Sequence, residues 1–467
     1  MVLLESGSHY TARDFNGVEG DMFFRLGRFA ATGDGSLSLY AGHCVGGSTV
    51  VNDALCWRTP PEILAGWREQ HGLEALTDAA LAPHLDRAWR DVAATPSRRA
   101  DLNRNAHALE RGAAALGWAA EPMARNVRGC AHLGLCNFGC PTNAKQSTLL
   151  SYVPRAIRHG ARLLADTRAE RILHQGGRVQ GVRATRRDPA TGEPGESIEI
   201  RAPRVCLAAG VLESGALLLR SGLPGRHATA GRDIQFHSSV HVTARFPEPI
   251  HGYFGPTMAY AISEFADVMG HAGPGFMIEN TTVHPLVTAQ NLPGFGEAHE
   301  RAMAALPHLA KAVIVLRDRT RGRVRLDDDG QARFDYALED GDLARMADGM
   351  RAAARAYLAA GAEEVWLPVD GLAPIRSEGD LARLSGRTFS QTELFSLYAV
   401  HLFGGAAMGG APSQGFCNVA GECFDLAGLS VVDASSLPGN TGANPQITIM
   451  ANALRIAAGI AAAEATR

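Results

Sequence analysis

The sequence predicts an α/β protein, α+β overall, with a Rossmann-like domain and a second domain in which helices cover an antiparallel sheet. Three observations predict it. The chain has 467 residues, more than one core usually supports. Two short apolar runs, 2–4 and 205–209, end at an acid or a glycine, as strands of a nucleotide-binding parallel sheet do. Several β-like runs, one of them clearly alternating, follow residue 236, as in an antiparallel sheet.

The first strand is predicted at 2–4 and is followed by Glu5 and Gly7. In a dinucleotide-binding βαβ unit the second strand ends in an acid that accepts hydrogen bonds from the adenosine ribose. Glu5 suits that role, and a solvent-facing carboxylate at a strand end is the alternative. The Gly-rich phosphate loop belongs about 20 residues earlier, so it is not among these 467 residues.

The predicted domains interleave along the chain. Residues 1–60, 125–235 and 396–467 form the nucleotide-binding domain, and 236–395 form the second domain. Residues 61–124 form a helical connection or lid, because apolar residues recur there at spacings of three and four. A hairpin is predicted at 322–336, and an amphipathic helix at 342–359.

Two glycine-containing turns offer backbone amides to a phosphate or a flat ring. The first is Gly46-Gly47-Ser48-Thr49, with Asn52 following, although a plain turn has the same pattern. The second ends the strand at 205–209: Ala209 and Gly210 precede a predicted helix that carries Ser214.

The C-terminal region is the most informative. His401 precedes a Gly-Gly turn, and Asn444 precedes Pro445 in a second turn rich in Gly and Pro. Between them an apolar strand at 429–433 ends in Asp433 and Ala434, and a helix is predicted from about residue 447. We therefore expect two turns to present one imidazole and one amide beside a cofactor.

Cys130, Cys136 and Cys140 form a C-x5-C-x3-C cluster followed by Pro141. Three thiolates can hold a three-iron cluster, although bacterial iron–sulfur runs that end in Cys-Pro use four thiolates at closer spacing. A loop with small, partly buried or redox-labile cysteines is the alternative. Lys145, just beyond, is expected to anchor a turn.

Composition excludes several classes of protein. A net charge of −3 gives no sign of a nucleic-acid partner, and eight cysteines in so long a chain do not indicate a secreted disulfide scaffold. No run of roughly 20 uninterrupted apolar residues indicates a transmembrane segment. The N-terminus has no signal-peptide pattern, so we expect a cytoplasmic protein.

The block from Cys130 to Cys140, with Pro141, Lys145, Ser147 and Thr148, looks most like the bacterial and long-chain alcohol members of the glucose–methanol–choline (GMC) family of flavoprotein oxidoreductases. Four separated motifs resemble the same family. They are Val2-Leu-Leu-Glu5-Ser-Gly7, Gly46-Gly47-Ser48-Thr49-x-x-Asn52, Val205-Cys-Leu-Ala-Ala-Gly210, and the terminal block from His401 through Asp433 to Asn444-Pro445-Gln446-Ile-Thr448. They occur in the family's order and span most of the chain.

The resemblance implies an FAD-dependent alcohol oxidoreductase, either an oxidase that uses O2 or a dehydrogenase with another redox carrier. His401 would act as the base that takes the hydroxyl proton, and Asn444 would orient the alcohol. The residues that would contact FAD are Glu5, Gly46, Gly47, Ser48, Thr49, Asn52, Ala169, Ala209, Gly210, Ser214, Asp433, Ala434, Pro445, Gln446 and Thr448. The second domain would bind a small-molecule alcohol.

Two alternatives remain open at this point. One is a sugar or polyol dehydrogenase that passes electrons through an iron–sulfur cluster at Cys130, Cys136 and Cys140. The other is an inactive, flavin-free remnant with a binding role. This alternative is suggested because the family's N-terminal Gly-x-Gly-x-x-Gly loop is not among these residues. A chain limited to these residues is expected to bind FAD weakly or not at all.

Overall fold

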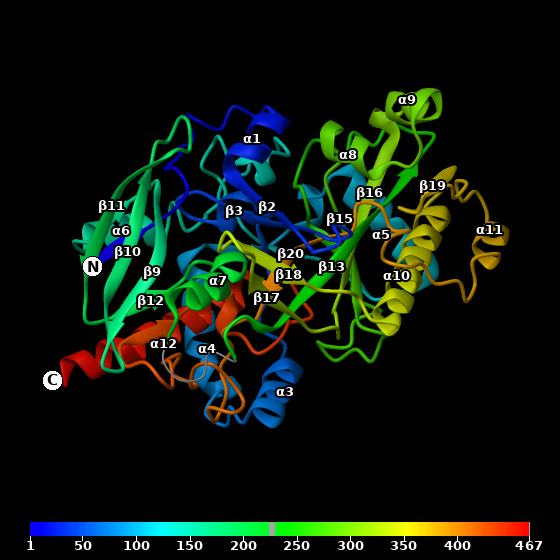
Figure 1. The fold of residues 1–467 in the computed structure, drawn as a ribbon. Helices are drawn as coiled ribbons and strands as arrows, with labels where there is room; N and C mark the ends of the chain where they lie inside the picture. Colours follow the sequence, from blue (N-terminus) through cyan, green and yellow to red (C-terminus); the bar gives the residue numbers. More distant parts are fainter. Residues whose placement is uncertain (224–228, 467) are drawn as a thin grey trace.

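The computed structural model describes residues 1–223 and 229–466, which form two parts lying side by side (Figure 1). Within these residues eleven strands join in one large sheet, antiparallel except where β3 meets β20. Its main path is β2 (Gly27–Ala31), β3 (Ser38–Gly42), β20 (Tyr398–Phe403), β13 (Arg232–Arg245), β16 (Leu309–Leu316), β15 (Phe276–Asn280), β14 (Tyr260–Ile262) and β6 (Ala120–Pro122). Off this path lie β17 (Gly322–Leu326), β18 (Ala332–Asp335) and β19 (Glu364–Trp366).

The large sheet has one largely apolar face and one face on which polar and apolar side chains are mixed. Helices α5 (Arg104–Leu116) and α10 (Asp340–Ala359) pack on the apolar face against residues such as Val240, Val242 and Ile314 (Figure 1). Successive residues of a strand point to opposite faces. The residues that alternate with these, including His237 and His241 on β13, therefore lie on the other face, which bears the site described below.

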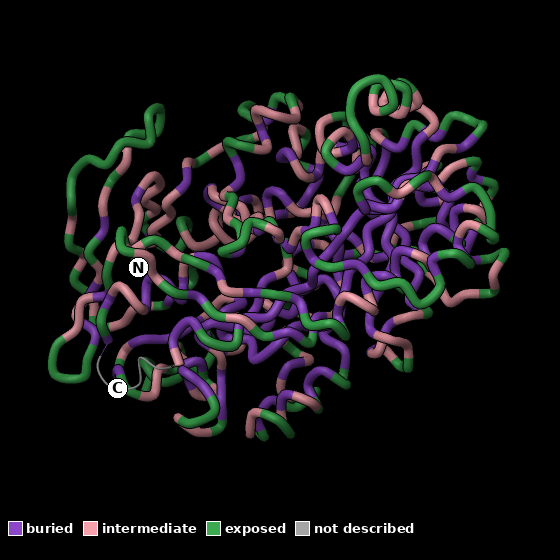
Figure 2. Tube along the Cα trace, turned by 45° about the vertical axis from the view of Figure 1, so that its right-hand side comes forward, coloured by how far each residue is buried: buried purple, intermediate pink, exposed green. Residues whose placement is uncertain are grey.

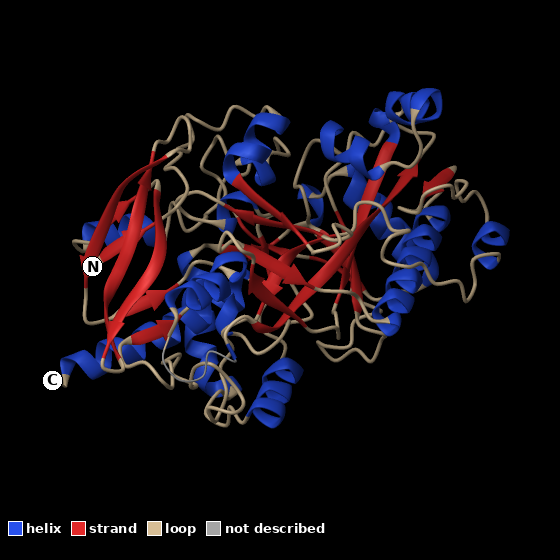
Figure 3. Cartoon of the chain, viewed as in Figure 1, coloured by secondary structure: helices blue, strands red, loops and turns tan. Residues whose placement is uncertain are grey.

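The second part contains three smaller sheets. β1 (Val2–Leu4) pairs in parallel with β8 (Arg162–Leu164), and β12 (Val205–Leu207) pairs in parallel with β21 (Leu429–Val431). A meander of β9 (Thr167–Gln175), β10 (Arg178–Arg187) and β11 (Pro194–Arg201) lies beside them (Figure 3). Helices α3 (Pro61–His71), α4 (Asp78–Asp91), α7 (Val211–Ser221) and α12 (Gln446–Ala465) belong to this side, and α12 packs on α4.

The remaining elements are short. Strands β4 (Leu55–Cys56), β5 (Ala94–Pro96) and β7 (Ala124–Asn126) form a small antiparallel sheet. The other helices are α1 (Glu19–Leu26), α2 (Ser48–Val51), α6 (Tyr152–Arg158), α8 (Pro285–Asn291), α9 (Gly296–Ala304) and α11 (Glu378–Ala382).

Strands β1 and β12 differ from the strands of a continuous parallel sheet. Among the described residues each has a strand partner on one side alone. Val2 is 38% exposed, and Cys206 and Ala209 are also exposed. Figure 2 shows the contrast with the large sheet, where buried residues are dense. The mixed α/β class predicted from the sequence is confirmed, and its parallel sheet is present as two separate pairs of strands.

Most predicted elements are found. The helical region contains α3, α4 and α5, and the predicted hairpin and long helix are β17–β18 and α10. The side chains of Thr77 and Asn103 cap α4 and α5. Because α5 packs on the large sheet and α4 on α12, helices of the predicted connection contact both parts. The domain boundaries themselves remain predictions.

One local prediction is wrong: His401 lies on a strand, β20, and not on a turn. The run from Tyr398 to Phe403 pairs with β13 and β3, and the predicted turn begins at Gly404. Nearby Gly and Pro obscure this six-residue strand in the sequence.

Candidate active site

His401 is placed by an irregularity in the pairing of β20 with β13. Phe236 pairs with Leu402 and Ser238 pairs with Ala399, so two residues of β20, Val400 and His401, oppose the single residue His237. Such a β-bulge locally re-aims side chains. Here it brings the rings of His237 and His401 together edge-on, with Nδ1 of each ring 3.2 Å apart and an interplanar angle of 87°.

His237 is fully buried and also contacts the loop before α12. Its Nε2 accepts a hydrogen bond of 3.1 Å from the backbone N–H of Gly442. The same loop is fixed to β13 by Asn440, whose backbone N–H donates to Oε1 of Gln235 and whose amide donates to the carbonyl of Phe236. One imidazole thus connects the strand that carries His401 with the loop that carries Asn444.

Asn444 is buried immediately before Pro445 and the start of α12. Its Nδ2 donates to Oε2 of Glu279 at 3.3 Å, and its Oδ1 is buried without a partner among the described residues. Glu279 is on β15, and its Oε1 also has no partner there. Burial raises the pKa of Glu279 to about 8. Two unpaired buried oxygens beside each other indicate a place for a hydrogen-bonding ligand.

Apolar side chains continue the same face of the sheet. Val313 on β16 pairs with both Glu279 and His241, so the three side chains form one row across β15, β16 and β13. Around that row lies a buried apolar cluster of Leu55, Met123, Met258, Ala261, Val313 and Val315, with Trp57 and Tyr398 packed against it.

The first turn of α12 is tied to residues 52–59. Nδ2 of Asn52 donates to Oε1 of Gln446 at 3.0 Å, and Gln446 Nε2 donates to the carbonyl of Leu55. The hydroxyls of Thr59 and Thr448 are 2.9 Å apart. The structure therefore brings Asn52 to the helix start that carries Gln446 and Thr448, almost 400 residues later in the sequence.

The Gly46–Asn52 segment forms a tight turn and the short helix α2. Gly46 and Gly47 have φ of 96° and 54°, which favours glycine. Thr49 Oγ1 donates to the Gly46 carbonyl, and the Ser48 hydroxyl accepts from Gly42 N–H. A side-chain carbon at Gly47 would meet no described atom within 4 Å, so the backbone borders open space.

Asp433 organises the start of α7. Its Oδ2 accepts from the backbone N–H of Gly210 at 2.7 Å and from the hydroxyl of Ser214 at 2.6 Å. Ala434 follows it in a short 3-10 turn. Gly210, with φ of 74°, also borders open space, and Ala209 before it is exposed.

Glu5 and Ala169 lie farther along the same side. The carboxylate of Glu5 accepts from Gly7 N–H at 2.7 Å, and burial raises its pKa to about 7. The carbonyl of Glu5 accepts from Thr167 N–H on β9, the strand that carries Ala169.

These residues fit a flavin dinucleotide at both ends. The unpaired oxygen of Asn444 and the polar start of α12 suit a polar ring system, and the open backbones of Gly47 and Gly210 leave room for a phosphate-bearing chain. Glu5 supplies a carboxylate at a strand end, as the ribose requires. The role of each predicted site residue remains a prediction.

The three cysteines of the cluster are not gathered as metal ligands in the described part of the chain. Within residues 1–223 and 229–466 no three His, Cys, Asp or Glu side chains gather in a way that holds a metal ion. Cys136 faces the buried Arg125, whose guanidinium donates to its sulfur at 3.1 Å, whereas Cys140 accepts from the backbone N–H of Lys145. Since these sulfurs serve separate contacts, the iron–sulfur alternative has no support.

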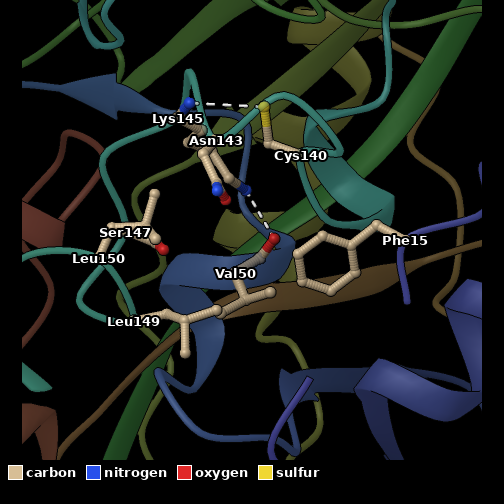
Figure 4. A pocket seen from close by; sticks show the side chains of 8 residues that line it. All are labelled: Phe15, Val50, Cys140, Asn143, Lys145, Ser147, Leu149 and Leu150. Carbon is tan, nitrogen blue, oxygen red and sulfur yellow. Dashed lines mark hydrogen bonds between the residues drawn. The ribbon is translucent and has the colours of Figure 1, made fainter. Parts of the chain in front are cut away.

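Lys145 has the structural role that the sequence predicts. Its ammonium group donates to the carbonyls of Val50, Asn52 and Cys136 at 2.6–2.7 Å, which fixes the end of α2 against the cysteine loop. Burial lowers its pKa to about 8. Figure 4 shows it beside a small pocket. That pocket is lined by Phe15, Val50, Cys140, Asn143, Lys145, Ser147, Leu149 and Leu150.

Sequence reasoning did not select His237 or Glu279. Glu279 ends one of the β-like runs that follow residue 236, and His237 lies just before another; the sequence shows His237, His241 and Glu279 without indicating which meets the site. Alternation along β13 identifies the face of His237. The bulge in β20 was the missing signal, because it decides which histidine meets His401.

One described helix, α12, is long and apolar enough to cross a membrane by length and composition, with a mean hydropathy of 1.3. Its first three turns are largely buried and it packs on α4, whereas the residues after Ile456 are mostly exposed. A single such helix is weak evidence for a membrane span.

Known solved structures share the fold. A pyridoxine 4-oxidase from Mesorbium loti superposes with a TM-score of 0.69 at 18% identity, covering 98% of this chain and 93% of that one. A formate oxidase superposes with a TM-score of 0.71 at 14% identity, covering 99% and 93%. At these identities the likeness establishes the fold alone.

Sequence comparisons give the family. An uncharacterized GMC-type oxidoreductase of Mycobacterium tuberculosis is 32% identical over 98% of this chain and 71% of its own length. A long-chain-alcohol oxidase of Arabidopsis thaliana is 25% identical over 99% of this chain and 64% of its own length. The N- and C-terminal models of the GMC oxidoreductases match residues 16–239 and 318–453. The chain therefore belongs to the GMC oxidoreductase family.

Proposed function

We propose that this GMC oxidoreductase uses FAD to oxidise the CH–OH group of an apolar alcohol to an aldehyde or ketone. The observation that carries the proposal is the arrangement of the partly exposed His401 and the buried Asn444, which one imidazole, that of His237, links across β20 and the loop before α12. The unpaired Oδ1 of Asn444 is available to an alcohol hydroxyl.

When bound, FAD supplies the acceptor for the hydride of the carbinol carbon. The residues that would hold it at the polar end are Asn52, Pro445, Gln446 and Thr448, and those along the remainder are Glu5, Gly46, Gly47, Ser48, Thr49, Ala169, Ala209, Gly210, Ser214, Asp433 and Ala434. Asn444 orients the alcohol hydroxyl, and His401 on β20 acts on the same hydroxyl.

Apolar surroundings support an apolar alcohol. The cluster that contains Leu55, Met123 and Met258 borders the row of Glu279 and Val313, so an alkyl chain placed there would be removed from water. The similarity to long-chain-alcohol oxidases of Arabidopsis thaliana agrees with this choice.

Anaerobic mixing of the FAD-loaded protein with primary alcohols of increasing chain length tests the proposal. We expect flavin absorbance to bleach, fastest with the longer chains, and His401→Ala to lose most of that rate. Turnover is also measured with dioxygen and with an artificial dye as the electron acceptor. An oxidase turns over with dioxygen, whereas a dehydrogenase needs the dye. Bound FAD that no alcohol bleaches contradicts the proposal. A chain that takes up no FAD would support the flavin-free binding role.

A further inference from the structure

His237 receives one hydrogen bond whose direction is fixed. The backbone N–H of Gly442 can only donate, so Nε2 of His237 is the acceptor and carries no proton. His237 is fully buried, and burial together with the neighbouring His401 and Arg317 holds its pKa well below the usual range. The ring is therefore neutral, and its one proton must be on Nδ1.

That proton determines the state of His401. Nδ1 of His237 lies 3.2 Å from Nδ1 of His401. Because His237 Nδ1 carries the proton, it donates, and Nδ1 of His401 accepts. Burial lowers the pKa of His401 to about 4, so this ring is neutral as well, and its own proton must be on Nε2.

We propose that His237 is a positioning residue that holds His401 in the tautomer with its proton on Nε2, so that His401 meets the substrate as a hydrogen-bond donor. The inference rests on the donor-to-acceptor direction of two hydrogen bonds in series, from Gly442 N–H to His237 and from His237 to His401. Nε2 of His401 has no partner in the described part of the chain, and the residue is partly exposed, so this N–H is open to a ligand.

The consequence for the reaction rests on the proposed function. In this tautomer Nε2 has no lone pair that could take the hydroxyl proton, and the lone pair of Nδ1 is occupied by His237. His401 therefore stabilises the alcohol oxygen by donating to it, in place of the role as base that the sequence predicts. Glu279, which is hydrogen-bonded to Asn444, is the acidic side chain that the site offers as proton acceptor, and because its pKa is raised to about 8 it takes the proton only when ionised, toward and above that pH.

Nitrogen NMR of the purified protein tests the tautomers without any substrate. The protein is labelled with ¹⁵N-histidine, and long-range ¹H–¹⁵N correlations distinguish protonated from bare ring nitrogens. His401→Gln and His237→Asn identify the two sets of signals. We expect protonated Nδ1 and bare Nε2 for His237, and the reverse for His401, at neutral pH. A proton on Nδ1 of His401, or on Nε2 of His237, overturns the proposal.

A pair of variants separates positioning from mere packing. In His237→Asn the side-chain amide nitrogen lies near the former Nδ1 and still donates to His401, whereas His237→Leu has no donor. We expect the His401 signals to keep the wild-type pattern in His237→Asn and to lose the hydrogen-bond shift of Nδ1 in His237→Leu. Identical His401 signals in wild type and His237→Leu contradict the proposal, and if His237→Leu does not fold, the wild-type tautomers decide alone.

Kinetics give an independent readout. Flavin reduction by alcohol is expected to fall at least tenfold in His237→Leu, mainly in kcat, with partial recovery in His237→Asn. A protein with the expected tautomers but no alcohol-dependent flavin reduction contradicts the proposed function and leaves the tautomer assignment standing. An active enzyme with the opposite tautomers contradicts the assignment alone.

Discussion

The two sides of the candidate site are built differently. On the side of the large sheet, His237, Asn444 and Glu279 are buried and fixed by hydrogen bonds among β13, β15 and the loop before α12. On the nucleotide side, β1 and β12 have one strand partner each among the described residues, and Ala209 is exposed. The residues that we propose act on the substrate are therefore organised by one sheet, and the residues that we propose contact the cofactor are organised by several smaller elements.

Because the two sides are built separately, we expect mutations to change the rate of the reaction and the affinity for FAD independently. Changes on the large-sheet side should alter the reaction with FAD affinity preserved. Changes on the nucleotide side should alter FAD affinity or the stability of the cradle.

His401→Ala should have the largest effect on the reaction. Removal of a group that acts on the alcohol oxygen is expected to slow flavin reduction by roughly 10²–10⁴-fold. Because His401 is not among the residues expected to contact FAD, the dissociation constant for FAD should stay within about threefold. Stopped-flow absorbance and flavin fluorescence titration measure the two quantities. Loss of FAD binding with the reaction would contradict the separation of the two sides.

Lys145→Met should have the largest effect on stability. The substitution leaves three buried carbonyls, those of Val50, Asn52 and Cys136, without their donor. We expect the free energy of unfolding to fall by roughly 3 kcal/mol. Urea unfolding followed by circular dichroism measures it. Lys311→Met is a useful comparison, since this buried lysine has one long contact, 3.4 Å to Asn291, and should lose less.

Glu279→Gln should change how stability depends on pH. The pKa of Glu279 is raised from 4.5 to about 8, so between these values the folded protein keeps a proton that the unfolded chain has released. This group's contribution to stability is therefore greatest below pH 4.5 and is lost as the pH rises to 8. Relative to wild type, the variant should gain roughly 4 kcal/mol between pH 5 and pH 9. Urea midpoints at the two pH values test this, and a parallel pH dependence in both proteins would contradict it.

Ser214→Ala should have the smallest effect. It removes one of two hydrogen bonds to Oδ2 of Asp433 and leaves that from Gly210. We expect a loss of about 1 kcal/mol in the free energy of unfolding, and a modest loss of FAD affinity with an unchanged rate of flavin reduction. Thermal unfolding and flavin titration measure these. A large fall in the reduction rate would show that the nucleotide side takes part in the chemistry.

Residues in continuous motifs were the most predictable from the sequence. Gly46, Asn52, Asp433 and Asn444 were selected from local patterns and from the resemblance to the family, and the long helices follow from their apolar spacing. The contacts between distant segments were not predictable in this way. Asn52 meets Gln446, and the pairing of His237 with His401 depends on a bulge of two residues against one in β20.

For the cysteine cluster, a continuous motif did not predict the contacts. Its spacing suggested a shared ligand, yet Cys136 and Cys140 serve different contacts, with Arg125 and with the Lys145 turn. Spacing alone does not fix the direction of each thiol, because the loop of 130–140 turns between them. Figure 4 shows how Cys140 meets the backbone of Lys145 at this turn.

The central claim is that the site of His401 and Asn444 removes hydride from the carbinol carbon of an alcohol. The most direct measurement is the rate of anaerobic flavin reduction by a long-chain primary alcohol and by its counterpart carrying two deuterium atoms at the carbinol carbon. We expect the flavin absorbance to bleach several-fold more slowly with the deuterated alcohol. Flavin that remains oxidised in the presence of both alcohols, or identical rates with the two, would contradict it.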